Sequence, residues 1–222
     1  MAKKFAWSFS ALGSYELCAK KHWHVNIAKD VKEPPNDAGE YGQSAHKHFE
    51  NRMMKAKPLP LDLRHHEKQL GKLAAIAGEK YGEQKLALND KFGLTGFFDS
   101  DVWVRTIIDW AVVSMDGTKA LIVDWKFGKK KDDDDQLELM AAVLFAAMPE
   151  LENIIATFYW AKEKEFVRQS YDRHDIPHIW NNFLPRVEAL EHAIKNSEFP
   201  ATPGFLCKNW CWVKSCPHCG NA

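Results

Sequence analysis

Two short apolar segments, IIDWAVV and ALIVDWKFGK, contain the residues best suited to chemistry. Asp109 lies in the first segment, and Asp124 and Lys126 lie in the second. Because side chains alternate along a β-strand, Asp124 and Lys126 share one face while Trp125 points to the other. If the two segments pair as a hairpin, Asp109 lies beside Asp124.

This arrangement suits an oxygen-rich metal site. Two carboxylates and the backbone carbonyl of Trp125 are ligands of the kind that Mg²⁺ or Mn²⁺ prefers. In phosphodiester hydrolysis such an ion neutralises phosphate charge and activates a water, while a lysine such as Lys126 orients the water or stabilises the transition state. The structural alternative is that each carboxylate lies at a strand edge and pairs with a lysine. Two acids inside apolar strands fit that alternative poorly, because charge near a core is costly unless it is paired or binds metal.

The fold expected to position these residues is α/β, with a central mixed β-sheet flanked by helices. Hydrophobic spacing and the breaks at proline and glycine separate helices from strands. The expected helices cover residues 8–28, 43–56, 62–82, 136–148 and 174–196, and the expected strands cover residues 83–89, 97–115, 120–127 and 153–161. We expect one domain over residues 1–222, ending in a cysteine-rich tail at 200–222.

The charge balance argues against a simple nucleic-acid-binding protein. Lys and Arg number 30, and Asp and Glu also number 30, so the formal net charge is zero. Contact with nucleic acid must then come from a local patch, which is sufficient for an enzyme that binds its substrate transiently. No apolar run reaches the roughly 18–20 residues that span a bilayer, and the start of the chain lacks a signal-peptide pattern. We therefore expect a cytoplasmic protein with no membrane partner.

Five cysteines are distributed unevenly, with Cys18 alone and the other four near the C-terminus. These four are Cys207, Cys211, Cys216 and Cys219. In a reducing compartment such crowding indicates a metal or cluster site rather than disulfides. One interpretation is a four-thiolate zinc site made by the C-terminal cysteines alone, closed by the C-x2-C of Cys216 and Cys219.

The order of these motifs resembles the PD-(D/E)XK nuclease superfamily, and within it the RecB-like branch that includes CRISPR-associated exonucleases and many phage-encoded nucleases. Asp109 followed by Asp124-x-Lys126 looks like the superfamily signature. The segment SFSALGSYELCAKKHW resembles the opening helix of the family, with Ser8, Leu12, Tyr15 and Cys18 in register. GQSAHKHFE resembles its G-x-x-x-H motif, and Gln136 resembles the first residue of its Q-x-x-x-Y motif.

The resemblance implies roles for residues outside the acid pair. His46 would be a metal ligand, and Glu50 and Glu83 are candidates for supporting the ligands. Gln136 would join the catalytic residues. Three lysines that follow the second strand are candidates for contacts with the DNA backbone. They are Lys129, Lys130 and Lys131.

The resemblance also implies a [4Fe–4S] cluster that packs the C-terminal cysteines against the N-terminal helix. Its ligands would be Cys18, Cys207, Cys211 and Cys216, so that Cys219 is spare. The spacing C-x3-C-x4-C departs from the C-x2-C-x5-C of the family, although the overall span is the same. Met140 stands where the family has a tyrosine, and Asp124 stands where the family often has glutamate.

The function implied by the resemblance is a Mg²⁺- or Mn²⁺-dependent DNA nuclease with a restriction-endonuclease-like core. Exonuclease action on DNA ends or single strands is favoured over sequence-specific cutting. A compact chain without a helicase resembles a phage nuclease of replication, recombination or repair, which would work in the bacterial host cytoplasm beside replication or recombination proteins. Two other classes remain open: a catalytically idle DNA-binding or assembly subunit that retains a zinc or iron–sulfur site, and a zinc-ribbon binding protein.

Overall fold

The computed structural model of the chain describes residues 5–34, 36–130 and 134–220. It divides into two compact units: residues 1–35 together with 180–222, and residues 36–179. The second unit contains the β-sheet and every residue of the predicted catalytic site. That residues 1–222 form a single domain remains a prediction.

Within the described residues the sheet has six strands in the order β2-β1-β3-β4-β5-β6. Its strands are β1 (Glu79–Leu88), β2 (Leu94–Thr95), β3 (Val104–Val113), β4 (Lys119–Lys126), β5 (Asn153–Trp160) and β6 (Glu165–Asp172). β4 and β5 are parallel, and every other pair of neighbouring strands in this sheet is antiparallel. The sheet is therefore mixed, as predicted, and the β3–β4 hairpin is present.

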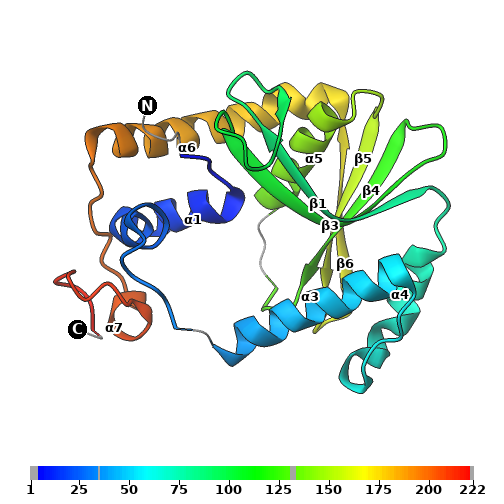
Figure 1. Cartoon of the computed structure of the whole chain (residues 1–222), viewed down its shortest axis with the longest axis horizontal. Helices are drawn as coiled ribbons and strands as arrows, with labels where there is room; N and C mark the ends of the chain where they lie inside the picture. The colour runs from blue at the N-terminus through cyan, green and yellow to red at the C-terminus, as the bar shows by residue number, and fades with distance from the viewer. Residues whose placement is uncertain (1–4, 35, 131–133, 221–222) are drawn as a thin grey trace. The chain divides into compact units, whose positions relative to one another are not determined.

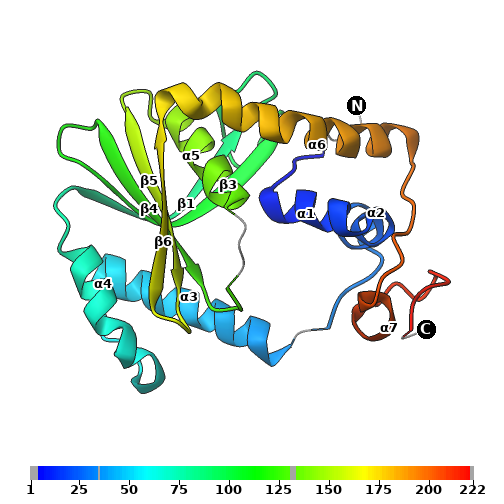
Figure 2. The ribbon, with the colours of Figure 1, turned by 180° about the vertical axis from the view of Figure 1, so that it is seen from behind.

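Helices cover both faces of this sheet. Figures 1 and 2 show α3 (Asp37–Lys55) and α4 (Glu67–Ala74) on one face and α5 (Asp135–Ala147) on the other. α5 provides the crossover between the parallel strands β4 and β5, the usual way to join parallel neighbours. This arrangement confirms the predicted α/β class, in which a mixed sheet is flanked by helices.

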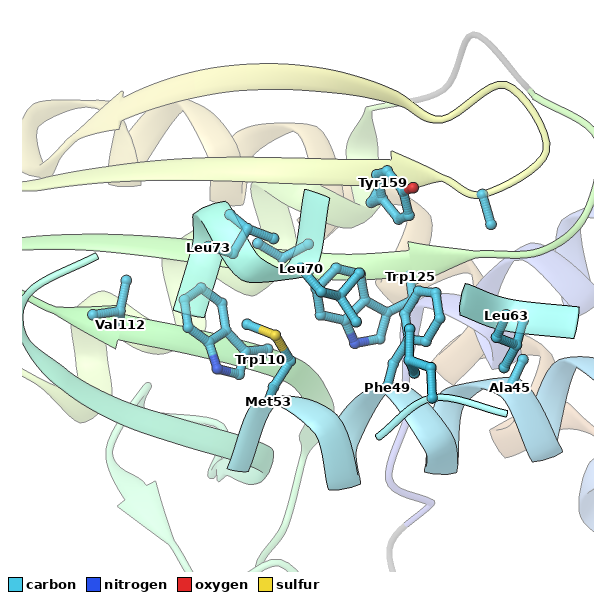
Figure 3. Close-up of a cluster of buried hydrophobic side chains, with 13 residues drawn as sticks. Ala45, Phe49, Met53, Leu63, Leu70, Leu73, Trp110, Val112, Trp125 and Tyr159 are labelled. Carbon is cyan, nitrogen blue, oxygen red and sulfur yellow. The ribbon is translucent and has the colours of Figure 1, made fainter. Parts of the chain in front are cut away.

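The core under α3 and α4 is aromatic (Figure 3). Phe49 of α3 meets the Trp125 ring edge-on, with centroids 5.4 Å apart. His66 lies among these rings, and its Nδ1 is 2.7 Å from the Tyr159 hydroxyl oxygen. Because Trp125 is buried in this core, its neighbours Asp124 and Lys126 must point to the opposite face of β4, toward α5. The packing of one face thus orients the polar residues of the other.

The helix predicted over residues 62–82 ends much earlier. A 3₁₀ turn (Leu61–His66) leads into α4, and β1 already begins at Glu79. Gly78 has a φ of 140°, and a Cβ at this position would lie 2.2 Å from the Val113 carbonyl oxygen. Only glycine fits this close backbone approach, so the chain leaves the helical pattern and enters the sheet here.

Strand β6 was not predicted, and β3 is shorter than the predicted strand. β6 is an edge strand in which charged and polar residues alternate with partly buried ones, so its hydrophobic signal is weak. Residues 97–103 precede β3 and turn, because the Gly96 amide donates to the Asp99 carboxylate at 2.9 Å. Helix α3 starts at Asp37, ahead of the predicted start at residue 43, because the Asn36 side chain caps it by accepting from the Gly39 amide.

The other unit carries the first helices and the C-terminal segment. Ser8 caps α1 (Phe9–Leu17) by accepting a hydrogen bond from the Ala11 amide. The predicted helix 8–28 is interrupted at Cys18, whose extended backbone separates α1 from α2 (Ala19–His22) and the π-helix that follows at residues 23–28. Trp7 stacks on Phe183 of α6 (Ile176–Asn196), and the last helix is α7 (Leu206–Trp210). No helix in the described ranges is long and apolar enough to cross a membrane.

Candidate active site

The two aspartates lie at the end of the β3–β4 ladder. The β3–β4 pairing stops at Trp110 opposite Val123, so Asp109 and Asp124 are the next residues on their strands. The Asp109 Oδ2 atom accepts a hydrogen bond of 2.8 Å from the Trp125 amide. The carboxylate of one strand thus takes the place of a backbone acceptor for the other. The hairpin register brings the acid pair together, as the sequence predicts.

Asp124, Lys126 and Gln136 form a closed ring of polar contacts. The Lys126 ammonium lies 2.7 Å from Asp124 Oδ2, and the Gln136 amide donates to Asp124 Oδ1 at 2.9 Å. The Gln136 carbonyl oxygen accepts from Lys126 at 2.7 Å. Gln136 lies in the first turn of α5, so this helix positions both charged groups of β4.

His46 extends this arrangement from α3. Its Nδ1 atom lies 3.3 Å from Asp109 Oδ2, and its ring meets the edge of Phe127 at 5.2 Å between centroids. His48, two residues later, is exposed. Burial lowers the pKa of His46, but the hydrogen bond and the charge of Asp109 outweigh burial and raise the pKa above its usual value. The helix therefore turns His46, rather than His48, toward the acid pair.

The ionised form of Asp124 is poorly stabilised by its surroundings. Its side chain is buried, and burial together with the charge of Asp109 raises its pKa to about 6, although Lys126 opposes the shift. Asp124 Oδ2 accepts no well-aligned hydrogen bond from any described residue, even though Lys126 is close. A cation at this position would satisfy the oxygen and relieve the repulsion between the two carboxylates.

The donor set therefore fits a hard divalent cation. Two carboxylates and one imidazole converge at the end of the ladder, and Asp124 Oδ2 still has acceptor capacity. As the side chains stand, no three His, Cys, Asp or Glu residues of the described chain are grouped tightly enough to hold a metal ion. The carboxylates instead contact Lys126, Gln136 and His46, and an ion would compete with the Lys126 and Gln136 contacts of Asp124.

The remaining predicted residues have no hydrogen bond or ion pair with the acid pair among the described residues. Glu50 pairs with Lys47 on the next turn of α3. Glu83 is exposed and has a φ of 46°, in the left-handed region. Lys130 is 2.9 Å from Glu165, Lys129 is exposed, and Lys131 lies outside the described residues. Met140 is buried in the packing of α5, so it offers nothing at the surface in place of the family tyrosine.

Phe158 is one neighbour of the site that was not predicted. The Lys126 ammonium lies 4.8 Å from the centre of its ring, within the range of a cation–π contact. Phe158 is paired with Asp124 in the parallel β4–β5 register. The sequence NIIATFYWA shows an aromatic strand, but it does not reveal which ring lies beside the lysine.

The cysteines belong to the other unit. Cys18, Cys207 and Cys211 line one largely apolar pocket of about 290 Å³, together with Leu17, Lys21, Trp210 and residues 202–206. The Thr202 amide donates to Cys18 Sγ at 3.5 Å, and the Lys20 amide donates to the Pro200 carbonyl at 3.1 Å. The C-terminal segment thus packs against the end of the first helix, as predicted.

The other two cysteines follow in the same C-terminal segment. Cys216 is buried, and Cys219 Sγ donates to the Cys211 carbonyl at 3.1 Å. Burial raises the pKa of the Cys211 thiol, and the neighbouring thiols of Cys219 and Cys207 add to the effect. Cys207 and Cys219 both lie near Cys211, but no three cysteines of the described chain are grouped tightly enough to hold a metal ion.

Comparison with known proteins adds a family and a fold. The family model described as PD-(D/E)XK nuclease superfamily matches residues 6–219. A protein from Eubacterium rectale, named in its crystal structure as a candidate exonuclease, has a TM-score of 0.53 and 11% identity, covering 93% of this chain and 86% of that chain. The crystal structure of SSO0001 has a TM-score of 0.48 and 13% identity, covering 98% of this chain and 88% of that one. The search of curated proteins found no match.

Proposed function

The chain belongs to the PD-(D/E)XK nuclease superfamily, and on that premise we propose that it hydrolyses phosphodiester bonds in DNA with Mg²⁺ or Mn²⁺. The observation that carries the proposal is the ring of Asp124, Lys126 and Gln136 beside Asp109. It combines a buried anionic centre with a lysine held in one place. In an ordinary surface ion pair the aspartate would not be buried, and the lysine would have no second contact such as the one with Gln136.

In this proposal His46, Asp109, Asp124 and the Trp125 carbonyl hold the ion. When bound, the ion supplies Lewis-acid stabilisation of phosphate charge and lowers the pKa of a water. Lys126 orients the attacking water or stabilises negative charge in the transition state. Gln136 holds Lys126 and Asp124 in their relative positions, so it acts on the reaction through them.

The substrate in this proposal is DNA, attacked at ends or in single strands, by an enzyme of the RecB-like branch. The support is the collinear set of motifs from Ser8 to Cys216 and the register that brings His46 to the acid pair. In the sequence Lys129 to Lys131 follow the active strand directly, and their positive charge supports a contact with the DNA backbone in this proposal. Phage origin, replication, recombination or repair proteins as partners, and the bacterial host cytoplasm as location are parts of the same proposal.

A [4Fe–4S] cluster held by Cys18, Cys207, Cys211 and Cys216 completes the proposal. The pocket shared by Cys18, Cys207 and Cys211 supports it, because it joins a cysteine of the first helical segment to the C-terminal cysteines. A zinc ion on Cys207, Cys211, Cys216 and Cys219 is the alternative, and the contact of Cys219 with Cys211 favours it. In both cases metal binding would be linked to the folding of residues 200–219.

The test of the proposed function is metal-dependent degradation of labelled DNA. Single-stranded, duplex and circular DNA are incubated with the protein in Mn²⁺, Mg²⁺ or EDTA, and products are followed from either labelled end. We expect stepwise shortening of linear DNA in Mn²⁺ or Mg²⁺ and none in EDTA. A protein that binds Mn²⁺ and DNA but leaves every substrate intact would instead be an idle DNA-binding subunit.

Calorimetric titration with Mn²⁺ tests the ligand set independently of activity. Asp109→Asn and Asp124→Asn should each lose metal binding, and His46→Ala should weaken it severely. His48→Ala is the matched control, because this exposed histidine lies on the same helix but away from Asp109. Equal effects at the two histidines would contradict the assignment of His46.

A further inference from the structure

An exposed row of side chains leads away from Asp109 along β3. Val104, Thr106 and Ile108 are buried, while Arg105 and Ile107 between them are partly or largely exposed. Side chains alternate along a strand, so Arg105 and Ile107 point to the same face as Asp109. Ile107 leaves 42% of its surface exposed, which is unusual for an isoleucine in the third strand of a six-stranded sheet. This face of β3 is therefore open next to the proposed active site.

The neighbouring strand and the following loop widen this row. Lys85 of β1 is exposed and lies opposite Ile107, so the two side chains share a face. The Arg105 guanidinium lies 5.3 Å from the centre of the Phe97 ring and 5.9 Å from that of Phe98. Arg105 Nε is buried and has no hydrogen-bond acceptor among the described residues. Cationic and apolar side chains are thus interleaved on one surface.

Phe98 is exposed on a turn that is ordered by hydrogen bonds. It leaves 76% of its surface exposed and meets the Phe97 ring edge-on at 5.1 Å between centroids. The turn that carries it is held by Thr95, whose hydroxyl donates to Asp101 at 2.7 Å, and by the Gly96 amide. An exposed ring on a pre-ordered turn loses little conformational freedom when a planar ligand stacks on it.

We propose that Lys85, Phe97, Phe98, Arg105 and Ile107 form a binding strip for an unpaired DNA strand that leads to Asp109. This inference rests on the proposed nuclease function. A solvent-exposed phenylalanine can stack on a base only if that base is free of duplex pairing and stacking. Arg105 and Lys85 supply positive charge for the backbone between the stacked base and the acid pair.

The charges near the strip favour a single strand over a duplex. Asp99 and Asp101 of the turn are negative, although their carboxylates accept hydrogen bonds from Thr95 and Gly96. Two acids beside the aromatic rings repel phosphates, so this surface lacks the continuous positive charge that binding to the backbone of duplex DNA requires. From Asp109 to Arg105 is four strand residues, or roughly 13 Å at about 3.3 Å per residue. The strip therefore engages nucleotides next to the cleaved bond rather than at the bond itself.

Binding of a fluorescent single-stranded oligonucleotide, followed by anisotropy in EDTA so that no cleavage occurs, tests the strip. Phe98→Ala should weaken single-strand binding by roughly 5- to 150-fold, the range expected for loss of one base–aromatic stack. Phe98→Trp should retain or strengthen binding. Met115→Ala is the matched control, because Met115 is 85% exposed in the turn at the other end of β3. It should bind like the wild type.

Lys85→Gln gives a second, electrostatic readout. It should reduce the slope of log Kd against log salt by roughly one unit for a lost phosphate contact. An unchanged Kd in Phe98→Ala, or an equal loss in Met115→Ala, would overturn the strip. Parallel cleavage assays separate the two proposals. A wild type that binds single strands but cuts nothing refutes the nuclease function alone, whereas a Phe98→Ala protein that cuts with unchanged KM refutes the strip alone.

Discussion

The carboxylate site and the cysteine pocket are both candidate metal centres, but they are built differently. Asp109, Asp124 and Lys126 lie on two neighbouring strands of a continuous ladder, and Gln136 is fixed by a 13-residue helix. Cys18 lies at a break between two helices, and the other cysteines lie in residues 207–219, where the described regular structure is the five-residue α7. One centre is positioned by secondary structure, whereas the other is positioned by irregular chain.

This difference indicates what each centre requires from its metal. Strand pairing keeps the two carboxylates side by side whether or not an ion is present, so the backbone framework of this centre is preassembled and the two negative charges repel each other. Only the side chains would have to close around an ion. The thiols have no such framework, so a cluster or zinc ion would itself hold the segment together. Removing metal should therefore abolish the activity of the carboxylate site without unfolding it. At the cysteine pocket, removing metal should destabilise the surrounding segment.

The largest expected effect is on the activity of the preassembled centre. Lys126→Ala should reduce kcat by at least about 100-fold, the scale on which loss of one group that stabilises transition-state charge is felt. The protein should still fold and bind Mn²⁺, because Lys126 does not hold the ion. Lys119→Ala is the control, since Lys119 is exposed at the opposite end of the same strand. Near wild-type cleavage by Lys126→Ala would show that the active site lies elsewhere.

The cysteine centre should respond to Cys18→Ser with loss of its metal. Anaerobically purified wild-type protein should be brown and contain about four irons per chain, as expected for a thiolate-held [4Fe–4S] cluster. Cys18→Ser should bleach it and expose residues 200–219 to proteolysis, while Cys219→Ser should keep the colour. A colourless protein that binds one zinc, tolerates Cys18→Ser and fails with Cys219→Ser would favour the zinc alternative and leave the nuclease proposal untouched.

A smaller effect should follow from loosening the carboxylate centre without removing a charge. Gln136→Ala takes away the bridge between Lys126 and Asp124, and should lower kcat by about tenfold, as expected for a residue that positions others. Because Gln136 also fixes the ammonium, the pH profile of kcat should shift as well. Gln43→Ala, an exposed glutamine on α3, serves as the control. Equal activity of the two variants would mean that the ring is not needed for catalysis.

The same contrast explains what could be predicted from the sequence. The pairing of Asp109 with Asp124 follows from strand alternation and a hairpin, both of which are local in the chain. Phe158 was missed because its neighbour, Lys126, is reached through a parallel pair joined by a long crossover, whose register depends on tertiary packing. β6 and the break at Cys18 were missed for a similar reason. An exposed edge strand and a helix interruption leave little trace in hydrophobic spacing.

The smallest expected effect tests whether the carboxylate centre stores repulsion when no metal is bound. Burial raises the pKa of Asp124 to about 6, so the folded protein binds more protons than the unfolded chain between about pH 4 and pH 6. The free energy of unfolding contributed by Asp124 must then fall as pH rises through this window.

His66 in the aromatic core provides the opposite slope. Burial lowers its pKa to about 4, so between about pH 4 and pH 6.5 the unfolded chain binds more protons at this residue. Its contribution to the free energy of unfolding therefore rises with pH over the same window and is lost as the pH falls.

In EDTA the pH dependences of Asp124 and His66 oppose each other. Asp124→Asn should remove the falling slope, so that urea unfolding shows stability rising more steeply from pH 4.5 to 6.5 than in the wild type. Mn²⁺ should steepen the wild-type curve in the same direction, because it binds the ionised carboxylate. Parallel curves for wild type and Asp124→Asn in EDTA would mean that Asp124 ionises at no cost to the fold, and that the carboxylate site stores no measurable repulsion without metal.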